Sequence, residues 1–300
     1  MAAYEHLQGA TTSGMKNGSR DEKEIAVGVP GIVPGPGPAE YEVIRAKGVA
    51  TVGGYTGYRE RLTTTLWRRE LPSSDVVMLI TFGNPIQLPR PPRGGEGGSS
   101  ACLVAALHDR VAVTGHSGLQ YGVEVRLSPL RAYSLLGLPM NAISNELVDM
   151  AALLGTNAAH LTERLAAAPD WRRRFDILNA ALTARVAAGP APDPAVRWAW
   201  QRLKSGAGAT PIAVLAEQIG WSRRHLERRF GQQVGLPPKT VARIFRFERA
   251  LGLLADRSRG LAEIAVRAGY SDQAHFSREL RALTQRTPRE LTASLRSARV

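Results

Sequence analysis

Residues 215–230 read LAEQIGWSRRHLERRF, and residues 264–280 read IAVRAGYSDQAHFSREL. Each segment begins with an apolar residue and Ala, passes through Gly-aromatic-Ser, and continues into an amphipathic stretch that carries Arg. The Gly lets a first helix end abruptly, and the Ser two residues later can cap a second helix through its hydroxyl. The pattern predicts two helix-turn-helix units, with Gly220 and Ser222 in the first turn and Gly269 and Ser271 in the second.

The second helix of each unit is expected to have one apolar face and one polar face. A turn of 3.6 residues puts positions four apart on the same face, which pairs Leu226 with Phe230 and Phe276 with Leu280. The opposite faces present Arg, His, Ser and Gln, and such side chains can read base edges or phosphates in a major groove. A single helix of this kind is more often a solvated surface, so it is the repetition that favours nucleic-acid binding.

The charge distribution favours the same interpretation. Residues 195–300 hold 20 Lys and Arg residues against 8 Asp and Glu residues, whereas residues 1–194 hold 19 against 18. Nearly all of the net charge of +13 therefore lies in the last third of the chain. A basic region joined to a nearly neutral one indicates that the C-terminal region meets a polyanion and the rest has another task.

These residues carry a family resemblance. The stretch from Ile212 to Leu291 resembles the DNA-binding domain of the AraC/XylS transcription regulators, through GWSRRHLERRF, RIFRFERALGLLA, LAEIAVRAGYSDQAHFSREL and TPREL. The resemblance implies a seven-helix domain at about residues 195–295. In it a long central helix holds two recognition helices for successive major grooves, about 34 Å apart on one side of the duplex.

The resemblance also implies roles for individual residues. The family's base-contacting positions match Arg224, Glu227 and Arg228 in the first unit and Gln273, His275, Ser277 and Arg278 in the second. Candidates for phosphate contacts are Arg223, His225, Lys239 and Arg243. Arg228 and Arg278 are the strongest candidates for base contacts, because Arg pairs bidentately with guanine.

Helical signals extend beyond the two units. From Pro238 to Ala255 apolar residues recur mostly at helical spacing, which predicts the central helix. Thr287-Pro288-Arg289-Glu290 has the form of a capping box and predicts a last helix. The segment PAVRWAWQRLKS, with Val196, Trp200 and Leu203 on one side, is expected to begin the DNA-binding domain at residue 195, after a linker at 189–194.

The N-terminal part predicts a different architecture. Residues 1–39 are rich in Gly and Pro and are expected to form a disordered tail. Residues 40–188 form the predicted regulatory, effector-binding or dimerisation domain, in which the short β-prone runs YEVIRA, VVMLITF, ACLVAAL, RVAVTGH and YGVEVRL indicate a small barrel or sandwich. Many AraC/XylS regulators carry a cupin-like barrel here, and this stretch resembles a divergent form of it.

Residues 129–188 are expected to be helical, in SPLRAYSLLGLP, NELVDMAALLG and a helical pair broken near Pro169. This layer could form a dimer contact or could only cover the barrel. The expected fold is thus α+β and multidomain: a β-rich cupin-like barrel with a helical layer, then an all-α domain of two helix-turn-helix subdomains joined by a long helix.

The sequence gives little support for a catalytic, metal-binding or cofactor-binding site. His108 and His116 are eight residues apart without a carboxylate in register, so no metal site, cofactor or catalytic residue is expected. Cys102 lies in an apolar run and is expected to be an inert core thiol. Two alternatives stay open: an alkyl-transfer repair or sensor protein that uses Cys102, and a non-specific nucleic-acid-binding protein.

The partners follow from this reading. They are a double-stranded DNA operator, RNA polymerase, a possible small-molecule effector and a possible second copy of the chain. The chain shows neither a signal peptide nor a long apolar run, which predicts a cytoplasmic protein without a membrane contact.

Overall fold

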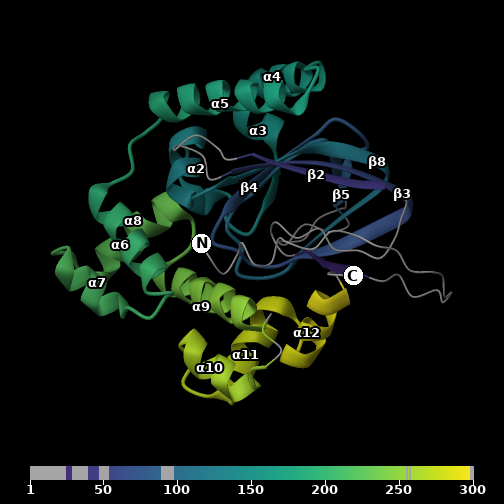
Figure 1. The fold of residues 1–300 in the computed structure, drawn as a ribbon. Coiled ribbons are helices and arrows are strands. Elements are labelled where there is room, and N and C mark those ends of the chain that lie inside the picture. The colour runs from purple at the N-terminus through teal and green to yellow at the C-terminus, as the bar shows by residue number, and fades with distance from the viewer. Residues whose placement is uncertain are drawn as a thin grey trace.

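A computed structural model describes residues 25–28, 40–46, 54–88, 98–254, 256 and 258–297. Within these residues a β-rich N-terminal part is followed by a layer of helices and then by an all-helical C-terminal part (Figure 1). The predicted fold class is confirmed. Residues 1–24 and 29–39 of the predicted tail lie outside the described residues, but Ile25–Gly28 form a short strand, β1.

The sheet is built around two long strands, β3 (Gly54–Glu70) and β8 (Ala112–Leu127), which pair antiparallel. The other strands are β2 (Glu40–Ala46), β4 (Val76–Thr81), β5 (Ile86–Leu88), β6 (Gly98–Ser100), β7 (Cys102–Ala105) and β9 (Leu147–Asp149). Among the described residues the sheet order is β1-β3-β8-β4-β7-β9, with β2 on β3 and β5 on β6 and β8. All of these pairs are antiparallel except β1 with β3.

The strand predictions need correction. RVAVTGH and YGVEVRL are not two strands but parts of β8, which continues through Gly118 at φ 68°. The longest strand, β3, has no counterpart in the prediction, because its buried positions include Glu60 as well as apolar residues and so lack a simple alternation.

Charged and polar side chains from β3 and β8 pair with one another inside the sheet. The Arg68 guanidinium donates to both carboxylate oxygens of Glu60 at 2.7 Å, and His116 Nε2 lies 3.0 Å from the same carboxylate. Burial opposes ionisation of Glu60, yet the His116 hydrogen bond and the Arg68 charge hold the pKa of this carboxyl below its usual value. The strand can therefore bury this acid because Arg68 of the same strand and His116 of β8 both contact its carboxylate.

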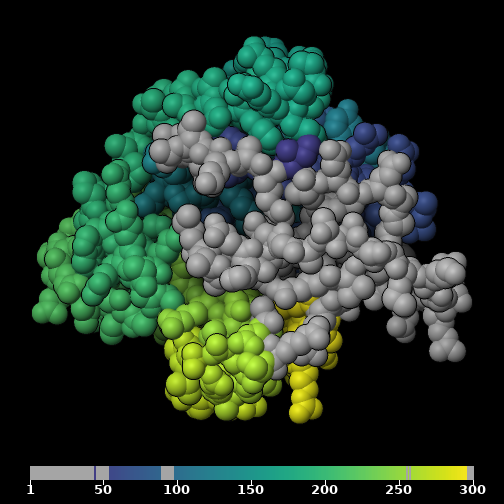
Figure 2. Space-filling view, viewed as in Figure 1, coloured from purple at the N-terminus to yellow at the C-terminus, as the bar shows by residue number. Residues whose placement is uncertain are grey.

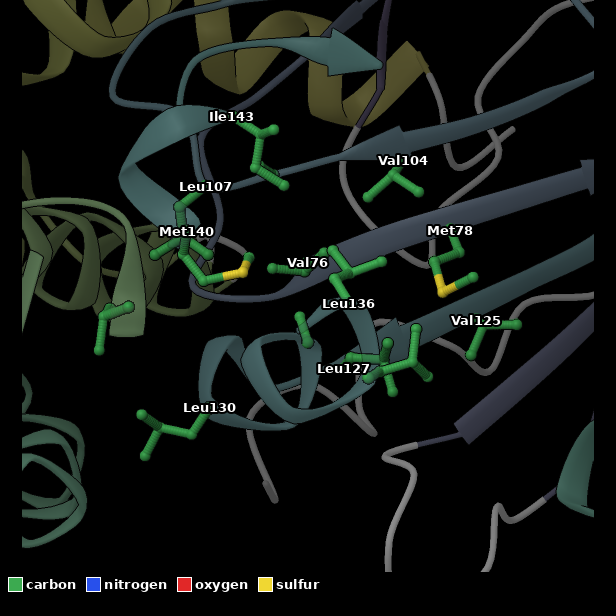
Figure 3. Close-up of a cluster of buried hydrophobic side chains, with 14 of the residues drawn as sticks. Val76, Met78, Val104, Leu107, Val125, Leu127, Leu130, Leu136, Met140 and Ile143 are labelled. Atoms are coloured by element: carbon green, nitrogen blue, oxygen red, sulfur yellow. The ribbon is translucent and has the colours of Figure 1, made fainter. Parts of the chain in front are cut away.

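The apolar core joins the sheet to the helices after it (Figure 3). Val76 and Met78 of β4 and Val125 of β8 contribute strand side chains, and Leu136 comes from helix α2 (Pro129–Leu136). Met140 lies in the short 3₁₀ helix η1 (Met140–Ala142) and is fully buried. The core therefore extends from the barrel into the first helices without a break.

A helical layer covers the barrel, as the sequence predicts. It comprises α3 (Met150–Leu154), α4 (Thr156–Ala166) and α5 (Trp171–Ala188). The predicted helix NELVDMAALLG is only partly correct, since Leu147–Asp149 pair with β7 as strand β9 and the helix starts at Met150. Tyr55 of β3 stacks on Phe175 of α5 at 5.7 Å between ring centroids, which fixes the layer on the sheet.

Seven helices make up the described C-terminal part, the number that the family resemblance implies. They are α6 (Pro194–Ser205), α7 (Ile212–Gln218), α8 (Arg223–Val234), α9 (Pro238–Leu254), α10 (Leu261–Ala268), α11 (Gln273–Thr284) and α12 (Pro288–Ser297). In Figure 1, α9 runs from the α6–α8 group to the α10–α12 group. The buried apolar residues of α9 up to Phe245 belong to a first core cluster, which also contains residues of the sheet and of α6–α8. Those from Phe247 onward belong to a second core cluster, which contains residues of α10–α12.

The N-terminal part contacts both helical groups. Gly235, at the end of α8, lies against Met140 and Ser144 of the segment around η1. Leu71, directly after β3, is buried in the cluster of the second group. Between them the Ser74 amide donates to Glu248 Oε1 of α9 at 2.7 Å. The two parts are therefore packed together along α9.

Candidate nucleic-acid interface

The first helix-turn-helix unit has the predicted geometry. Gly220 takes φ 70° at the end of α7, a conformation that favours glycine. Ser222 Oγ accepts from the His225 amide at 3.2 Å and caps α8, and Leu226 and Phe230 are fully buried. These contacts fix which face of α8 points away from the core.

The outward face of α8 is basic. Arg223, Arg224, Glu227 and Arg228 are exposed, as the sequence predicts. His225 is half-buried, because its ring packs edge-on against Trp221 at 4.4 Å between centroids. Arg228 Nη2 lies 3.4 Å from His225 Nδ1, a contact at the long end of the hydrogen-bond range that leaves the rest of the guanidinium accessible.

The opposite side of α8 is anchored by residues that the sequence analysis did not single out. Arg229 Nη2 lies 3.2 Å from Asp193 Oδ2, and Gln233 Oε1 accepts from the Asp193 amide at 2.9 Å. Asp193 also caps α6 by accepting from the Ala195 amide. Its position directly before Pro194 is a capping signal that the sequence does carry. One residue thus ties the start of the helical domain to the first recognition helix.

The second unit repeats the arrangement with a different cap. Gly269 takes φ 92° after α10, as predicted, but the prediction of Ser271 as the helix cap is wrong. Asp272 caps α11 by accepting from the His275 amide at 2.6 Å, and this hydrogen bond holds the pKa of its carboxyl below the usual value. Asp caps a helix as well as Ser does, and here the helix starts one residue later than predicted, so Asp272 takes the capping position in place of Ser271.

The outward face of α11 holds the predicted residues in two environments. Gln273 and Arg278 are exposed, whereas His275 and Ser277 are half-buried. His275 Nδ1 lies 3.0 Å from Ser271 Oγ, and Ser277 Oγ donates to the Gln273 carbonyl at 2.8 Å. Gln273 and Arg278 therefore offer the more accessible polar atoms of this face.

Two phosphate candidates on α9 differ in their surroundings. Lys239 is exposed near the helix start. Arg243 Nε donates to Glu279 Oε1 of α11 at 2.9 Å, and Arg246 Nη2 lies 3.6 Å from Glu279 Oε2. Sequence reasoning missed Glu279 and Arg246, because neither belongs to the outward face of a recognition helix.

The predicted last helix is capped as expected. The Glu290 amide donates to Thr287 Oγ1 at 3.3 Å, and the Thr287 amide donates to Glu290 Oε2 at 2.7 Å. This reciprocal pair is a capping box. It starts α12, and the buried Leu291 of this helix joins the second core cluster.

The residues weighed for other chemistry are placed in the sheet region. Cys102 is buried in β7 with Sγ 3.3 Å from Thr162 Oγ1, and burial raises the pKa of its thiol. His108 is buried too, and burial lowers the pKa of its imidazole to about 4. No group of His, Cys, Asp and Glu that could hold a metal ion occurs among the described residues. In the same part of the chain, every helix is too short or too polar to cross a membrane.

Comparisons with known proteins match the C-terminal part. A family model described as a helix-turn-helix domain covers residues 215–294. The transcriptional activator RhaS of Escherichia coli (strain SE11) is 36% identical over 77 residues, which cover 26% of this chain and 28% of RhaS. An uncharacterized helix-turn-helix regulator of Staphylococcus aureus is 29% identical over 79 residues, 26% of this chain and 11% of that protein. The chain thus matches less than a third of the length of these curated relatives.

Solved structures were also found. ToxT from Vibrio cholerae has a TM-score of 0.47 and 12% identity, with 80% of this chain and 97% of ToxT covered. The C-terminal domain of AraT, a response regulator from Geobacillus stearothermophilus, has a TM-score of 0.33 and 25% identity, covering 35% of this chain and 88% of that chain. The family model and the two paired helix-turn-helix units together show that residues 215–294 form a helix-turn-helix domain, which is similar in sequence to part of the transcriptional activator RhaS.

Proposed function

We propose that this chain is a sequence-specific DNA-binding transcription regulator whose two helix-turn-helix units read successive major grooves on one side of the duplex. The observation that carries the proposal is the pairing of two recognition helices, α8 and α11, on one rigid helix, α9. Each has a buried apolar face and an outward face with exposed Arg. An α-helix that presents Arg can enter a major groove and pair with guanine.

The proposed contacts divide into two kinds. Base reading is assigned to Arg224, Glu227 and Arg228 of α8 and to Gln273, His275, Ser277 and Arg278 of α11. Phosphate binding is assigned to Arg223, His225, Lys239 and Arg243, which adds affinity without sequence preference. α9 has 17 residues. At 1.5 Å per residue it spans about 25 Å, so the two recognition helices must lie farther apart than α9 is long to match a groove repeat of about 34 Å.

The N-terminal part is assigned a regulatory role. Ser144, after η1, and Leu71 and Ser74, in the loop after β3, contact the two helical groups and α9, so a change in the barrel can reach both recognition helices. In this role the N-terminal part either senses a small molecule or pairs with a second copy of the chain. The other proposed partner is RNA polymerase, in the cytoplasm.

The alternatives have less support. An alkyl acceptor needs an accessible thiolate, and Cys102 is buried with a raised pKa. A non-specific nucleic-acid-binding protein would bind all duplexes alike at a given salt concentration.

Selection of bound duplexes from a random library, by purified protein at near-physiological salt, tests the proposal. The expected result is a motif of two short blocks about one helical turn apart. If the library stays unenriched, the selection is repeated with residues 191–300. A motif from that fragment alone would assign an inhibitory role to the N-terminal part, and no motif from either would refute the proposal.

A further inference from the structure

Two arginines of α9 converge on one acid of the second recognition helix. Arg243 Nε donates to Glu279 Oε1 at 2.9 Å, and Arg246 Nη2 lies 3.6 Å from Glu279 Oε2. The Glu279 side chain is only 14% exposed, which shields both pairs from solvent. Half-buried charge-assisted contacts of this kind are directional, unlike the apolar contacts of Phe276 and Leu280 that hold the same helix to the core.

Arg246 also reaches the first helical group. Its Nη1 donates to the Gly208 carbonyl, in the loop between α6 and α7, at 3.2 Å. Gly208, at φ 74°, lies so close to the Ala242 carbonyl of α9 that an added Cβ would clash. The acceptor of Arg246 is therefore fixed against α9.

The same side chain lies against the turn of the second unit. The Arg246 guanidinium carbon is 5.8 Å from the Tyr270 ring centroid, and its Cδ lies beside Gly269. One residue thus contacts the loop before the first unit, the turn of the second unit and the second recognition helix. Phe245 and Phe247 of α9 also lie in the apolar clusters of the two groups, one in each, but apolar contacts lack this directionality.

We infer that Glu279, held by Arg243 and Arg246, is a positioning residue that sets the angle of α11 relative to α8, and hence the half-site spacing that the protein accepts. The inference rests on the proposed function. Inserting one base pair between two half-sites rotates one against the other by roughly a tenth of a turn and separates them by about 3.4 Å. If the angle between α8 and α11 is fixed, the inserted base pair lowers the affinity strongly. If the angle is free to change, the affinity falls less.

The test measures binding to duplexes that carry the selected two-block site with the spacer shortened or lengthened by one and two base pairs. Wild-type protein is expected to lose about tenfold or more in affinity for one inserted base pair. Glu279→Gln, which keeps the shape and removes the charge, and Arg246→Met are expected to lose about threefold or less. Each affinity is divided by that variant's affinity for its best spacer, because freed arginines also strengthen non-specific binding.

Glu263→Gln is the matched control. Glu263 of α10 also pairs with two arginines, Arg259 at 3.1 Å and Arg267 at 2.8 Å, but it does not connect α10 to α9. This variant is expected to retain the wild-type spacing profile. Thermal unfolding establishes that each variant is folded.

The possible outcomes distinguish a failure of the positioning role from a failure of the proposed function. If wild-type protein selects two blocks and both Glu279→Gln and Arg246→Met keep its spacing profile, the positioning role is wrong while the proposed function stands. If wild-type protein selects no two-block site, the proposed function itself fails. A spacing profile that broadens in Glu263→Gln as much as in Glu279→Gln would also overturn the inference, because any lost ion pair would then suffice.

Discussion

At the scale of single residues, side chains proposed to read bases differ from those proposed to supply only charge. Arg228 is exposed on α8 and stands one turn from Arg224 on the same face, whereas Lys239 is exposed at the start of α9. Both are cations, so removing either one lowers the net charge of the protein by the same amount. Only a residue that reaches a base edge changes the preference among sequences.

Arg228→Ala is expected to weaken binding to the selected site by about 1 to 3 kcal/mol and to relax the preference at one base pair. Lys239→Ala is expected to weaken binding to all duplexes alike and to lower the slope of log affinity against log salt by about one. Fluorescence anisotropy with matched and single-substituted duplexes over a salt series measures both effects. Equal losses on specific and random duplexes for Arg228→Ala would reject its base-reading role.

At the scale of elements, sequence predicted the helix-turn-helix units better than the sheet. Gly220, Ser222 and the Thr287–Glu290 box are local signals whose function depends on neighbours a few residues away. Strand β3 was missed because the burial of Glu60 depends on its pairing with Arg68 and His116, and His116 lies 56 residues further along the chain. The Glu279 pairs were missed for the same reason, since their partners lie on another helix.

Two glycines near the first recognition helix provide a test of this local argument. A Cβ at Gly220 or at Gly231 would meet no atom within 4 Å, so backbone conformation alone decides the effect of alanine. Gly220→Ala is expected to destabilise by about 1 to 2 kcal/mol, because Gly220 sits at φ 70°. Gly231→Ala, inside α8, is expected to stabilise by about 0.5 to 1 kcal/mol.

Chemical denaturation of both variants, followed by circular dichroism, gives the two free energies of unfolding. The opposite signs are the essential result. Stabilisation by Gly220→Ala would mean that the turn does not require a positive φ.

At the scale of the whole molecule, a buried acid joins the N-terminal part to α9. Glu248 accepts from the Ser74 amide, with Asp75 of the same loop and Lys204 of α6 nearby. Burial raises the pKa of Glu248 to about 7, and the charge of Asp75 acts in the same direction. No sequence signal connects these residues, because Ser74 and Glu248 lie 174 positions apart.

The raised pKa predicts a pH dependence of stability. Folded protein keeps a proton on Glu248 up to about pH 7, whereas unfolded protein releases it near the ordinary pKa of 4.5. The contribution of Glu248 to the free energy of unfolding is therefore full below about pH 4.5 and is lost as pH rises through about 7. Glu248→Gln keeps an acceptor for Ser74 without the charge. It is expected to be more stable than wild type at about pH 8, by about 1 to 3 kcal/mol, and equal to it at about pH 4.5.

Urea denaturation at these two pH values measures the difference. Glu217→Gln, on the exposed side of α7, serves as the control and is expected to match wild type at both. A Glu248→Gln variant that is less stable than wild type at about pH 8 would show that the charged carboxylate stabilises this contact between the two parts.

The central claim, that both units of one chain read adjacent major grooves, is tested most directly by methylation protection of guanine N7 on the selected duplex. Arg contacts guanine at N7 and O6 in the major groove, so bound protein shields these atoms. Wild-type protein is predicted to protect two patches about one helical turn apart, with Arg228→Ala exposing one patch and Arg278→Ala exposing the other. A single protected patch, or the loss of the same patch in both variants, would contradict the account.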